Sequence, residues 1–361
     1  MHIKKEPMQI VHEVLAAYGL TDELVKAELI GTGLINHTWK VTAANDMYIL
    51  QKVNEYVFKK PTDIVHNIKL LADYLQSNYP AYLFVAPVTA LDGNTFINLK
   101  EEGHFRLFPF IEDSHTNEIV ETTAHAYEAA VQFGRFTKLL TGFNCSQLHI
   151  TIPSFHNLTL RHELFLMSVE KGNQQRIQES DLLIKQLMGY SFIAETYKHI
   201  LNDASFQLRV THHDTKISNV LFDNTDKGLC VIDLDTVMPG YFISDVGDMM
   251  RTYLSPANEE ETDFSKIEVR DKFYKAIVKG YLAEMKNNLS EVEKKHFFFA
   301  GQFMIYMQAI RFLTDYFNDD VYYGAKYAEH NLNRALNQTV LLEKFTEKKD
   351  AFTSFTNIFL C

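Results

Sequence analysis

Hydrophobic residues near the start of the chain follow first a helical and then a strand-like spacing. Apolar residues recur at helical spacing between positions 7 and 18, and Gly19 follows them, which predicts a helix over 7–18. Short apolar runs then predict strands, which lie at 25–30, 35–41, 47–53, 84–88, 95–99 and 104–108. A second helical pattern lies between them, at 61–78. The first hundred residues are therefore expected to form a small antiparallel sheet with two helices.

From about residue 112 onward, the apolar spacing is mainly helical. Helices are expected at 122–140, 158–192, 295–317 and 330–341. The change of pattern marks a boundary between two lobes, so we predict an α+β fold. Residues 1–108 would form a small lobe with a sheet, and residues 109–361 a larger helical lobe.

One segment of the second lobe departs from the helical spacing and carries most of the candidate chemistry. Residues 220–222 and 229–234 have strand-like spacing with turn-forming residues between them, which predicts a hairpin. A hairpin brings its two ends together. Here the ends carry three carboxylates, an amide and an ammonium, namely Asp214, Lys216, Asn219, Asp233 and Asp235. Carboxylates repel one another unless a cation lies among them, and Mg²⁺ prefers such oxygen ligands, so we predict a magnesium site. The alternative is a polar turn followed by an edge strand with solvated acidic residues.

Composition narrows the class of protein. The chain has 361 residues, of which 46% are hydrophobic and 22% charged, as is typical of a globular protein large enough for two lobes. The formal net charge of −11 argues against a nucleic-acid partner. The most apolar stretch, 297–313, is interrupted by Gln302, Gln308 and Arg311, so it predicts a buried helix rather than a membrane span.

Cysteine usage bears on the compartment. The three cysteines, Cys145, Cys230 and Cys361, lie far apart and provide neither a disulfide framework nor a zinc site, which fits a reducing environment. The first residues are polar and lack the pattern of a signal peptide. We therefore expect a cytoplasmic protein without membrane partners. We also expect it to act as a monomer or a weak dimer.

The spacing of polar residues around the hairpin matches a known catalytic loop. In protein kinases an Asp accepts the proton of the acceptor hydroxyl, an Asn five residues later binds metal, and a second metal-binding Asp follows. Asp214, Asn219 and Asp233 have this arrangement. The segment resembles the aminoglycoside phosphotransferase and choline kinase superfamily, small-molecule kinases that share the protein-kinase fold. Its stretches HHDTKISNVLFD, VIDLDTVMPG and DVGDMMR are most similar to N-acetylhexosamine 1-kinases.

The resemblance implies a bilobal protein-kinase-like fold and an ATP- and Mg²⁺-dependent kinase, and it assigns roles to residues. Asp214 would orient the acceptor hydroxyl and take its proton, while Lys216 would screen charge on the transferring group. Asn219 and Asp233 would hold Mg²⁺ on the phosphates. Asp235 would bind a second metal ion or order its water.

The first lobe is expected to bind ATP. The resemblance extends to residues 31–36, which contain Gly31, Gly33 and Asn36. Glycines at a hairpin let backbone N–H groups approach phosphates. Kinases also place a Lys on the third strand. Gln51 and Lys52 are neighbours there and point to opposite faces, and charge favours Lys52.

Two further features of the first lobe follow from the resemblance. The helix at 61–78 contains no Glu, which is the usual partner of the strand Lys, and Asp63 and Asn67 are the nearest substitutes. In the resembling family, the connection between the lobes offers backbone groups to the nucleotide base. That connection contains Phe108 and Phe110.

Asp245 lies where a helix is expected to begin, after a turn at 238–241. In related kinases an Asp near this point braces the catalytic loop through its backbone. A carboxylate is favourable at the N-terminus of any helix, so a structural role is the favoured interpretation of Asp245.

Three residues of the second lobe are candidates for acceptor binding: Arg311, Tyr322 and His156. Arg311 lies in an apolar helix, where an unpaired guanidinium is costly. Asp315, one turn later, is a possible partner, whereas the resemblance favours a donor fork for the hydroxyls or acyl carbonyl of a sugar. Tyr322 is placed to stack on a sugar ring, and His156 to reach the substrate from a loop.

We therefore predict transfer of the γ-phosphoryl group of ATP to the anomeric hydroxyl of N-acetylglucosamine or N-acetylgalactosamine, giving the 1-phosphate. One alternative is a kinase of another small alcohol, such as homoserine, choline, methylthioribose or an aminoglycoside. Another is a pseudokinase that binds the nucleotide without transferring phosphate.

Overall fold

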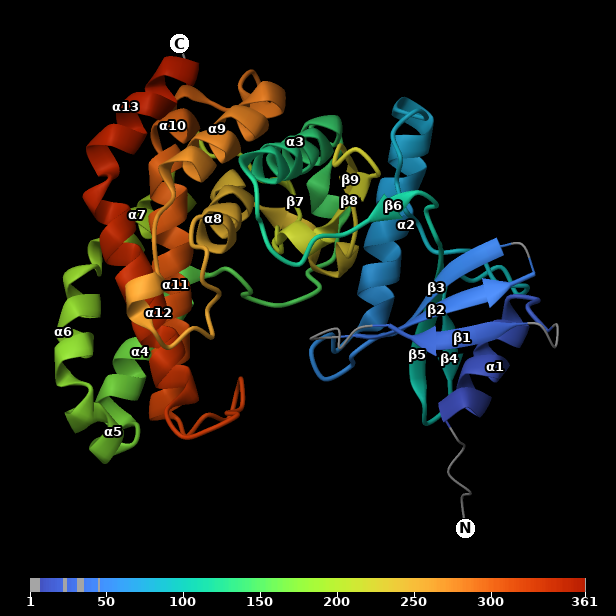
Figure 1. Cartoon of the computed structure of the whole chain (residues 1–361), viewed down its shortest axis with the longest axis horizontal. Coiled ribbons are helices and arrows are strands. Elements are labelled where there is room, and N and C mark those ends of the chain that lie inside the picture. The colour runs from blue at the N-terminus through green and yellow to red at the C-terminus, as the bar shows by residue number, and fades with distance from the viewer. Residues whose placement is uncertain (1–6, 22–24, 31–35, 45, 361) are drawn as a thin grey trace. The chain divides into compact units, whose positions relative to one another are not determined.

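The computed structural model describes residues 7–21, 25–30, 36–44 and 46–360 (Figure 1). The chain divides into two compact units. Unit 1 comprises Met1–Ser114, Ser146–Pro153 and Ile232–Met238. Unit 2 comprises His115–Cys145, Ser154–Val231 and Pro239–Cys361. The predicted first lobe ended at residue 108, whereas unit 1 continues to Ser114 and takes in two distant segments.

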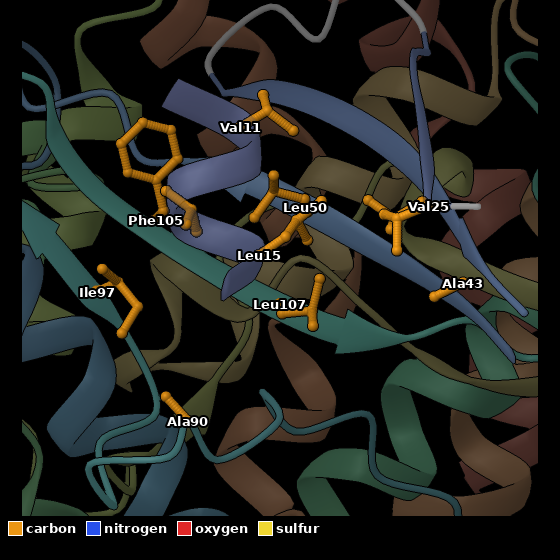
Figure 2. Close-up of a cluster of buried hydrophobic side chains, with 11 residues drawn as sticks. Val11, Leu15, Val25, Ala43, Leu50, Ala90, Ile97, Phe105 and Leu107 are labelled. Carbon is orange, nitrogen blue, oxygen red and sulfur yellow. The ribbon is translucent and has the colours of Figure 1, made fainter. Parts of the chain in front are cut away.

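Unit 1 contains an antiparallel sheet whose described strands have the order β1-β2-β3-β5-β4. The strands are β1 (Lys26–Leu29), β2 (His37–Ala43), β3 (Asp46–Lys52), β4 (Ile97–Leu99) and β5 (Gly103–Pro109). Helix α1 (Pro7–Ala17) contributes Val11, Val14 and Leu15 to a hydrophobic core with Leu50 and Leu107 of the sheet (Figure 2). The small sheet with two helices that the apolar spacing predicted is present.

One predicted strand, at 84–88, does not form: this part of the described chain has no regular secondary structure. Pro87 lies in the middle of the run and has no N–H to donate to a sheet ladder. A single backbone bond, from Val88 N to Leu107 O at 2.6 Å, joins this segment to β5.

Helix α2 (Pro61–Asn78) has the bounds that the apolar spacing predicted. Pro61 occupies the first turn, where its missing N–H costs nothing, and Ile64, Ile68, Leu71 and Leu75 form its buried stripe. The short helix η3 (Leu234–Thr236), which belongs to the segment 232–238, packs against α2 within unit 1.

Unit 2 is mainly helical. Its helices of nine or more residues are α3 (Thr123–Leu139), α4 (Leu158–Lys171), α6 (Asp181–Gly189), α7 (Phe192–Leu201), α8 (Phe242–Tyr253), α9 (Asp271–Met285), α11 (Phe297–Phe317), α12 (His330–Glu347) and α13 (Lys349–Leu360). The short helices α5 (Gln174–Glu179), η4 (Phe264–Lys266) and α10 (Glu291–Lys295) lie between them. Almost every side chain of α11 is buried, and α4, α8 and α12 pack around it. No helix in the described part of the chain is both long and apolar enough to cross a membrane.

The predicted hairpin is present in unit 2. Strand β8 (Val220–Asp223) pairs with β9 (Gly228–Val231), and the register places Val220 opposite Val231. The segment before the hairpin runs from β7 (Arg209–Thr211) to the short helix η2 (Ile217–Asn219). β7 pairs with β10 (Met238–Gly240), which forms where a turn was expected.

Candidate active site

The loop between β7 and η2 is held in place by hydrogen bonds to the first two turns of α8. The backbone N–H groups of His212 and His213 donate to the two carboxylate oxygens of Asp245, at 3.0 and 2.8 Å. Thr215 N donates to Asp248 Oδ2 at 2.8 Å. Asp245 therefore braces the loop through its backbone, as the resemblance implied, and the bracing stabilises the left-handed backbone of His213, at φ 66°.

The Asp214 side chain is 15% exposed, whereas its neighbours His213 and Thr215 are buried. Lys216 Nζ lies 3.1 Å from Asp214 Oδ2. The Asn219 side chain donates its Nδ2 to the carbonyl oxygen of Asp214 at 2.9 Å. Because the amide nitrogen is used inside the loop, the amide oxygen of Asn219 is the atom left to bind a cation. The structure thus brings Asp214, Lys216 and Asn219 together within unit 2.

Asp233 and Asp235 belong to unit 1. Asp233 precedes η3 with a left-handed backbone, at φ 59°. The carboxylate of Asp235 is 2% exposed and lies 2.5 Å from Arg106 Nη1. Its second oxygen accepts a hydrogen bond from Asn36 Nδ2 at 2.9 Å. Both oxygens of Asp235 therefore have protein partners, which differs from the environment expected of a metal ligand.

The other side of η3 is fixed by α2. Asn67 is fully buried and donates Nδ2 to Val237 O at 3.0 Å and to His149 O at 2.8 Å. Its Oδ1 accepts the N–H of His149 at 2.8 Å. Asp63 contacts the His149 side chain instead, at 2.8 Å. Neither candidate substitute for the missing helix Glu pairs with Lys52.

The predicted nucleotide-binding residues are only partly described. Gly31 and Gly33 lie outside the described residues. Asn36 bridges Asp235 and the backbone N–H of Asn54, so its described contacts are internal. Phe108 lies beneath the Arg106 guanidinium, 5.0 Å from ring centroid to Cζ.

The connection after β5 is partly bonded to the sheet. Phe110 donates its backbone N–H to Met47 O at 3.0 Å, and Ile111 O accepts a hydrogen bond from the Ser114 hydroxyl at 2.6 Å. Base contacts by the backbone at Phe108 and Phe110 stay a prediction.

The register of β3 and β5 separates Gln51 from Lys52. Lys52 lies opposite Phe105, on the face that carries the core with α1, and its Nζ is 5.6 Å from the Phe105 ring centroid. Gln51 lies opposite Arg106 on the other face, and its Oε1 accepts hydrogen bonds from Arg106 at 2.8 and 3.2 Å. Contrary to the prediction that it faces the nucleotide, Lys52 therefore lies on the core face of β3, and Gln51 lies on the face shared with Arg106.

The candidate acceptor residues gather in unit 2. The Arg311 Cζ lies 5.9 Å from the ring centroids of Phe155 and Tyr322 and 5.6 Å from that of Tyr323. Asp315 does not pair with Arg311. Its two oxygens accept the backbone N–H groups of Tyr322 and Tyr323, at 2.7 and 2.9 Å. Among the described residues, Arg311 makes one hydrogen bond, to Gln308 Oε1 at 3.4 Å, and no ion pair.

A second arginine, Arg161, lies near Arg311. Burial, and then the positive charge of Arg311, lowers the pKa of the Arg161 guanidinium. Arg161 lies in the first turn of α4, where the helix dipole is also unfavourable to a cation. Its Nη2 donates to Ser154 O at 3.2 Å, while its buried Nε has no hydrogen-bond partner among the described residues.

His156 lies beside this pair but is engaged within the protein. Its Nδ1 contacts the Ser244 hydroxyl, which also lies 2.8 Å from His213 Nδ1, and its ring stacks on Phe155. Burial, and then the nearby His213 and Arg311, lowers the pKa of His156 well below 6.5. His156 is therefore neutral near pH 7.

Arg106 and Arg161 were not among the residues predicted to be functional. Arg106 is the one charged residue in the apolar run 105–108, and Arg161 is an Arg in the first turn of a helix. A cation is unusual at both positions. This conflict with local preference is the sequence feature that could have identified the two arginines as functional candidates.

The sequence model of a phosphotransferase enzyme family matches residues 26–288, which is more than half of the chain. The chain belongs to this family. Its fold is shared with an aminoglycoside phosphotransferase from Alicyclobacillus acidocaldarius subsp. acidocaldarius DSM 446, with a TM-score of 0.65 and 12% identity over 99% of this chain and 98% of that one. A microcompartment-associated aminopropanol kinase gives a TM-score of 0.61 and 14% identity over 96% of this chain and 98% of that one. A spectinomycin phosphotransferase, in complex with ADP and spectinomycin, gives a TM-score of 0.55 and 13% identity over 98% of this chain and 99% of that one. The predicted α+β, kinase-like fold and superfamily membership are confirmed, and the protein is a phosphotransferase.

Proposed function

We propose that this phosphotransferase is an ATP- and Mg²⁺-dependent kinase that phosphorylates the anomeric hydroxyl of an N-acetylhexosamine. The observation that carries the choice of acceptor is the pair Arg161 and Arg311. Two guanidinium groups without a carboxylate partner among the described residues repel a cationic acceptor and favour one rich in oxygen acceptors. Choline and aminoglycosides carry positive charge and fit this cluster poorly. The hydroxyls and acetamido carbonyl of an N-acetylhexosamine fit it well.

Asp214 is the proposed catalytic base. Its carboxylate is the partly exposed acidic group of the braced loop. An anomeric hydroxyl is more acidic than an ordinary alcohol, so a carboxylate suffices to take its proton. Lys216, 3.1 Å away, offsets negative charge beside Asp214. Catalysis of this type depends mostly on positioning and electrostatic stabilisation, which the backbone bonds to Asp245 and Asp248 supply.

The donor set fits magnesium bound together with a nucleotide. No group of three or more His, Cys, Asp or Glu side chains suited to a metal ion occurs in the described part of the chain. Magnesium in kinases needs only one or two protein oxygens, because phosphates and water complete its coordination. Asn219 and Asp233 are the proposed protein ligands, with the Asn219 oxygen left available by the bond from its Nδ2. When bound, Mg²⁺ would neutralise charge on the phosphates.

A turnover assay tests the proposal directly. The protein is incubated with ATP and Mg²⁺ and, in parallel, with N-acetylglucosamine, N-acetylgalactosamine, glucose, choline, homoserine and kanamycin, and ³¹P NMR identifies the product. We expect turnover of the two acetylated sugars, with the phosphorus coupled to the anomeric proton. Preferred turnover of choline or kanamycin would overturn the proposed acceptor class. Nucleotide binding without turnover of any compound would favour a pseudokinase.

The acceptor role of Arg311 is tested by Arg311→Gln. A charge-assisted hydrogen bond contributes about 1.5–3 kcal/mol, so we expect the KM for the sugar to rise roughly 10- to 150-fold while the KM for ATP stays unchanged. Arg135→Gln is the matched control, because Arg135 pairs with Glu284 and takes no part in the Arg311 cluster. An equal KM for the sugar in the two variants would refute the role of Arg311.

A further inference from the structure

The strand cation of unit 1 lies on β5 rather than on β3. Arg106 is 2% exposed, although its neighbours Phe105 and Leu107 point to the opposite, apolar face. Its Nη1 lies 2.5 Å from Asp235 Oδ1, and its Nε and Nη2 both donate to Gln51 Oε1. The guanidinium therefore links two strands of the sheet to the segment 232–238.

A buried ion pair of this kind contributes little net stability, because desolvation of both ions offsets their attraction. What it provides here is a fixed geometry. Asn36 donates to the second oxygen of Asp235 at 2.9 Å, so the carboxylate is held from two directions. Gln51 is fixed in turn, since its Nε2 lies 3.4 Å from the Thr38 hydroxyl.

The geometry matters because of what precedes Asp235. Asp233 lies two residues earlier and has a left-handed backbone, at φ 59°, a conformation that is uncommon for residues other than Gly. Arg106 fixes the turn through Asp235, and Asn67 fixes its end through Val237 O at 3.0 Å. The turn that follows Asp233 is thus held at Asp235 and at Val237 by buried polar contacts of unit 1.

We propose that Arg106 is a positioning residue for the magnesium ligand Asp233 and acts through Asp235. This inference rests on the proposed function, in which Asp233 binds Mg²⁺ together with the nucleotide. It also assigns Asp235 to the support of Asp233 rather than to a second metal ion. A strand Lys paired with a helix Glu, as in protein kinases, does not occur at the corresponding positions, since Lys52 lies on the core face and α2 has no Glu.

The test is a calorimetric titration of ADP into the protein over a series of Mg²⁺ concentrations. Replacing a residue that hydrogen-bonds to a metal ligand and orients it typically changes metal affinity about 10- to 100-fold. We expect Arg106→Gln to need at least about tenfold more Mg²⁺ than the wild type for half-maximal tightening of ADP binding. Asp235→Asn should raise the Mg²⁺ requirement to a similar extent. Because both substitutions act through one contact, the double variant should need no more Mg²⁺ than the more impaired of the two single variants.

Two controls separate this role from a general loss of stability. Arg176→Gln breaks a partly buried ion pair with Asp320 in unit 2 and should leave the Mg²⁺ requirement unchanged. The fluorescence of Trp39, the single tryptophan of the chain, reports whether unit 1 is folded. If Arg106→Gln does not fold, Arg106→Lys replaces it. A single ammonium cannot span Gln51 and Asp235 as the guanidinium fork does, so the Mg²⁺ requirement should still rise.

The outcomes distinguish the two proposals. A folded Arg106 variant with the Mg²⁺ requirement of the wild type would overturn the positioning role and leave the proposed function intact. Wild-type protein whose ADP binding does not depend on Mg²⁺ would overturn the proposed function, and the role of Arg106 with it.

Discussion

Replacing Asn67 by Ala should destabilise unit 1 more than any exposed substitution on the same helix. Asn67 is fully buried and makes three hydrogen bonds, two to the segment 146–153 and one to the segment 232–238. A neutral hydrogen bond contributes about 1 kcal/mol net, and a buried group left without a partner costs about 1–3 kcal/mol. The three bonds give a loss of about 3 kcal/mol. The carbonyl oxygen of the buried Val237, left without this partner, raises the loss to about 4–5 kcal/mol.

The assay is urea unfolding followed by the fluorescence of Trp39, which lies on β2 and therefore reports on unit 1. Asn78→Ala is the matched control. Asn78 lies on the same helix, is exposed, and bonds only to Tyr74 O within that helix, so its replacement should cost less than about 0.5 kcal/mol. Equal losses in the two variants would show that the bonds of Asn67 do not hold the two distant segments to α2.

Three further predictions concern the catalytic loop and its surroundings. Asp214→Asn should lower kcat roughly 10²- to 10⁴-fold while ADP affinity, measured by calorimetry, changes little; near-normal turnover would rule out Asp214 as the base. Asp233→Asn should weaken ADP binding in the presence of Mg²⁺ but not in its absence, and equal weakening under both conditions would argue against a metal ligand. The pKa of His156 lies well below 6.5 in the folded protein, so below that pH the unfolded chain binds the extra proton. The free energy of unfolding should therefore fall by up to about 1.4 kcal/mol per pH unit as the pH drops below about 6.5, and His156→Asn should make this slope shallower. An unchanged slope in urea unfolding of that variant would contradict the burial of a neutral His156.

Elements with a strong local signal were predicted well from the sequence. Helix α2 has its predicted bounds because Pro61 fixes its start and four apolar residues recur at helical spacing. The β8–β9 hairpin formed as predicted because turn residues separate two short apolar runs. The run at 84–88 failed because apolar spacing alone does not register the missing N–H of Pro87.

The parts of the site that were missed depend on contacts between residues far apart in the chain. Arg106 and Asp235 are separated by 129 positions, and Asn67 and Val237 by 170. Lys52 and Asp235 were predicted to be functional because they are charged residues at suitable positions in the local sequence. Local spacing did not reveal which face of β3 carries the core, because that depends on the pairing of β3 with β5.

The missing helix Glu and the displaced strand cation have one physical explanation. The α2 residue that faces η3 must donate hydrogen bonds, because its neighbours are the carbonyl oxygens of Val237 and His149. A Glu has no donor when ionised, so at position 67 it would leave both carbonyls unpaired and would bury a charge beside them. With an amide there, position 67 offers no anion to a cation on the sheet. The anion comes instead from Asp235, and Arg106 on β5 is the cation that reaches it. Asn67 and Arg106 are therefore complementary parts of one arrangement that holds the turn after Asp233.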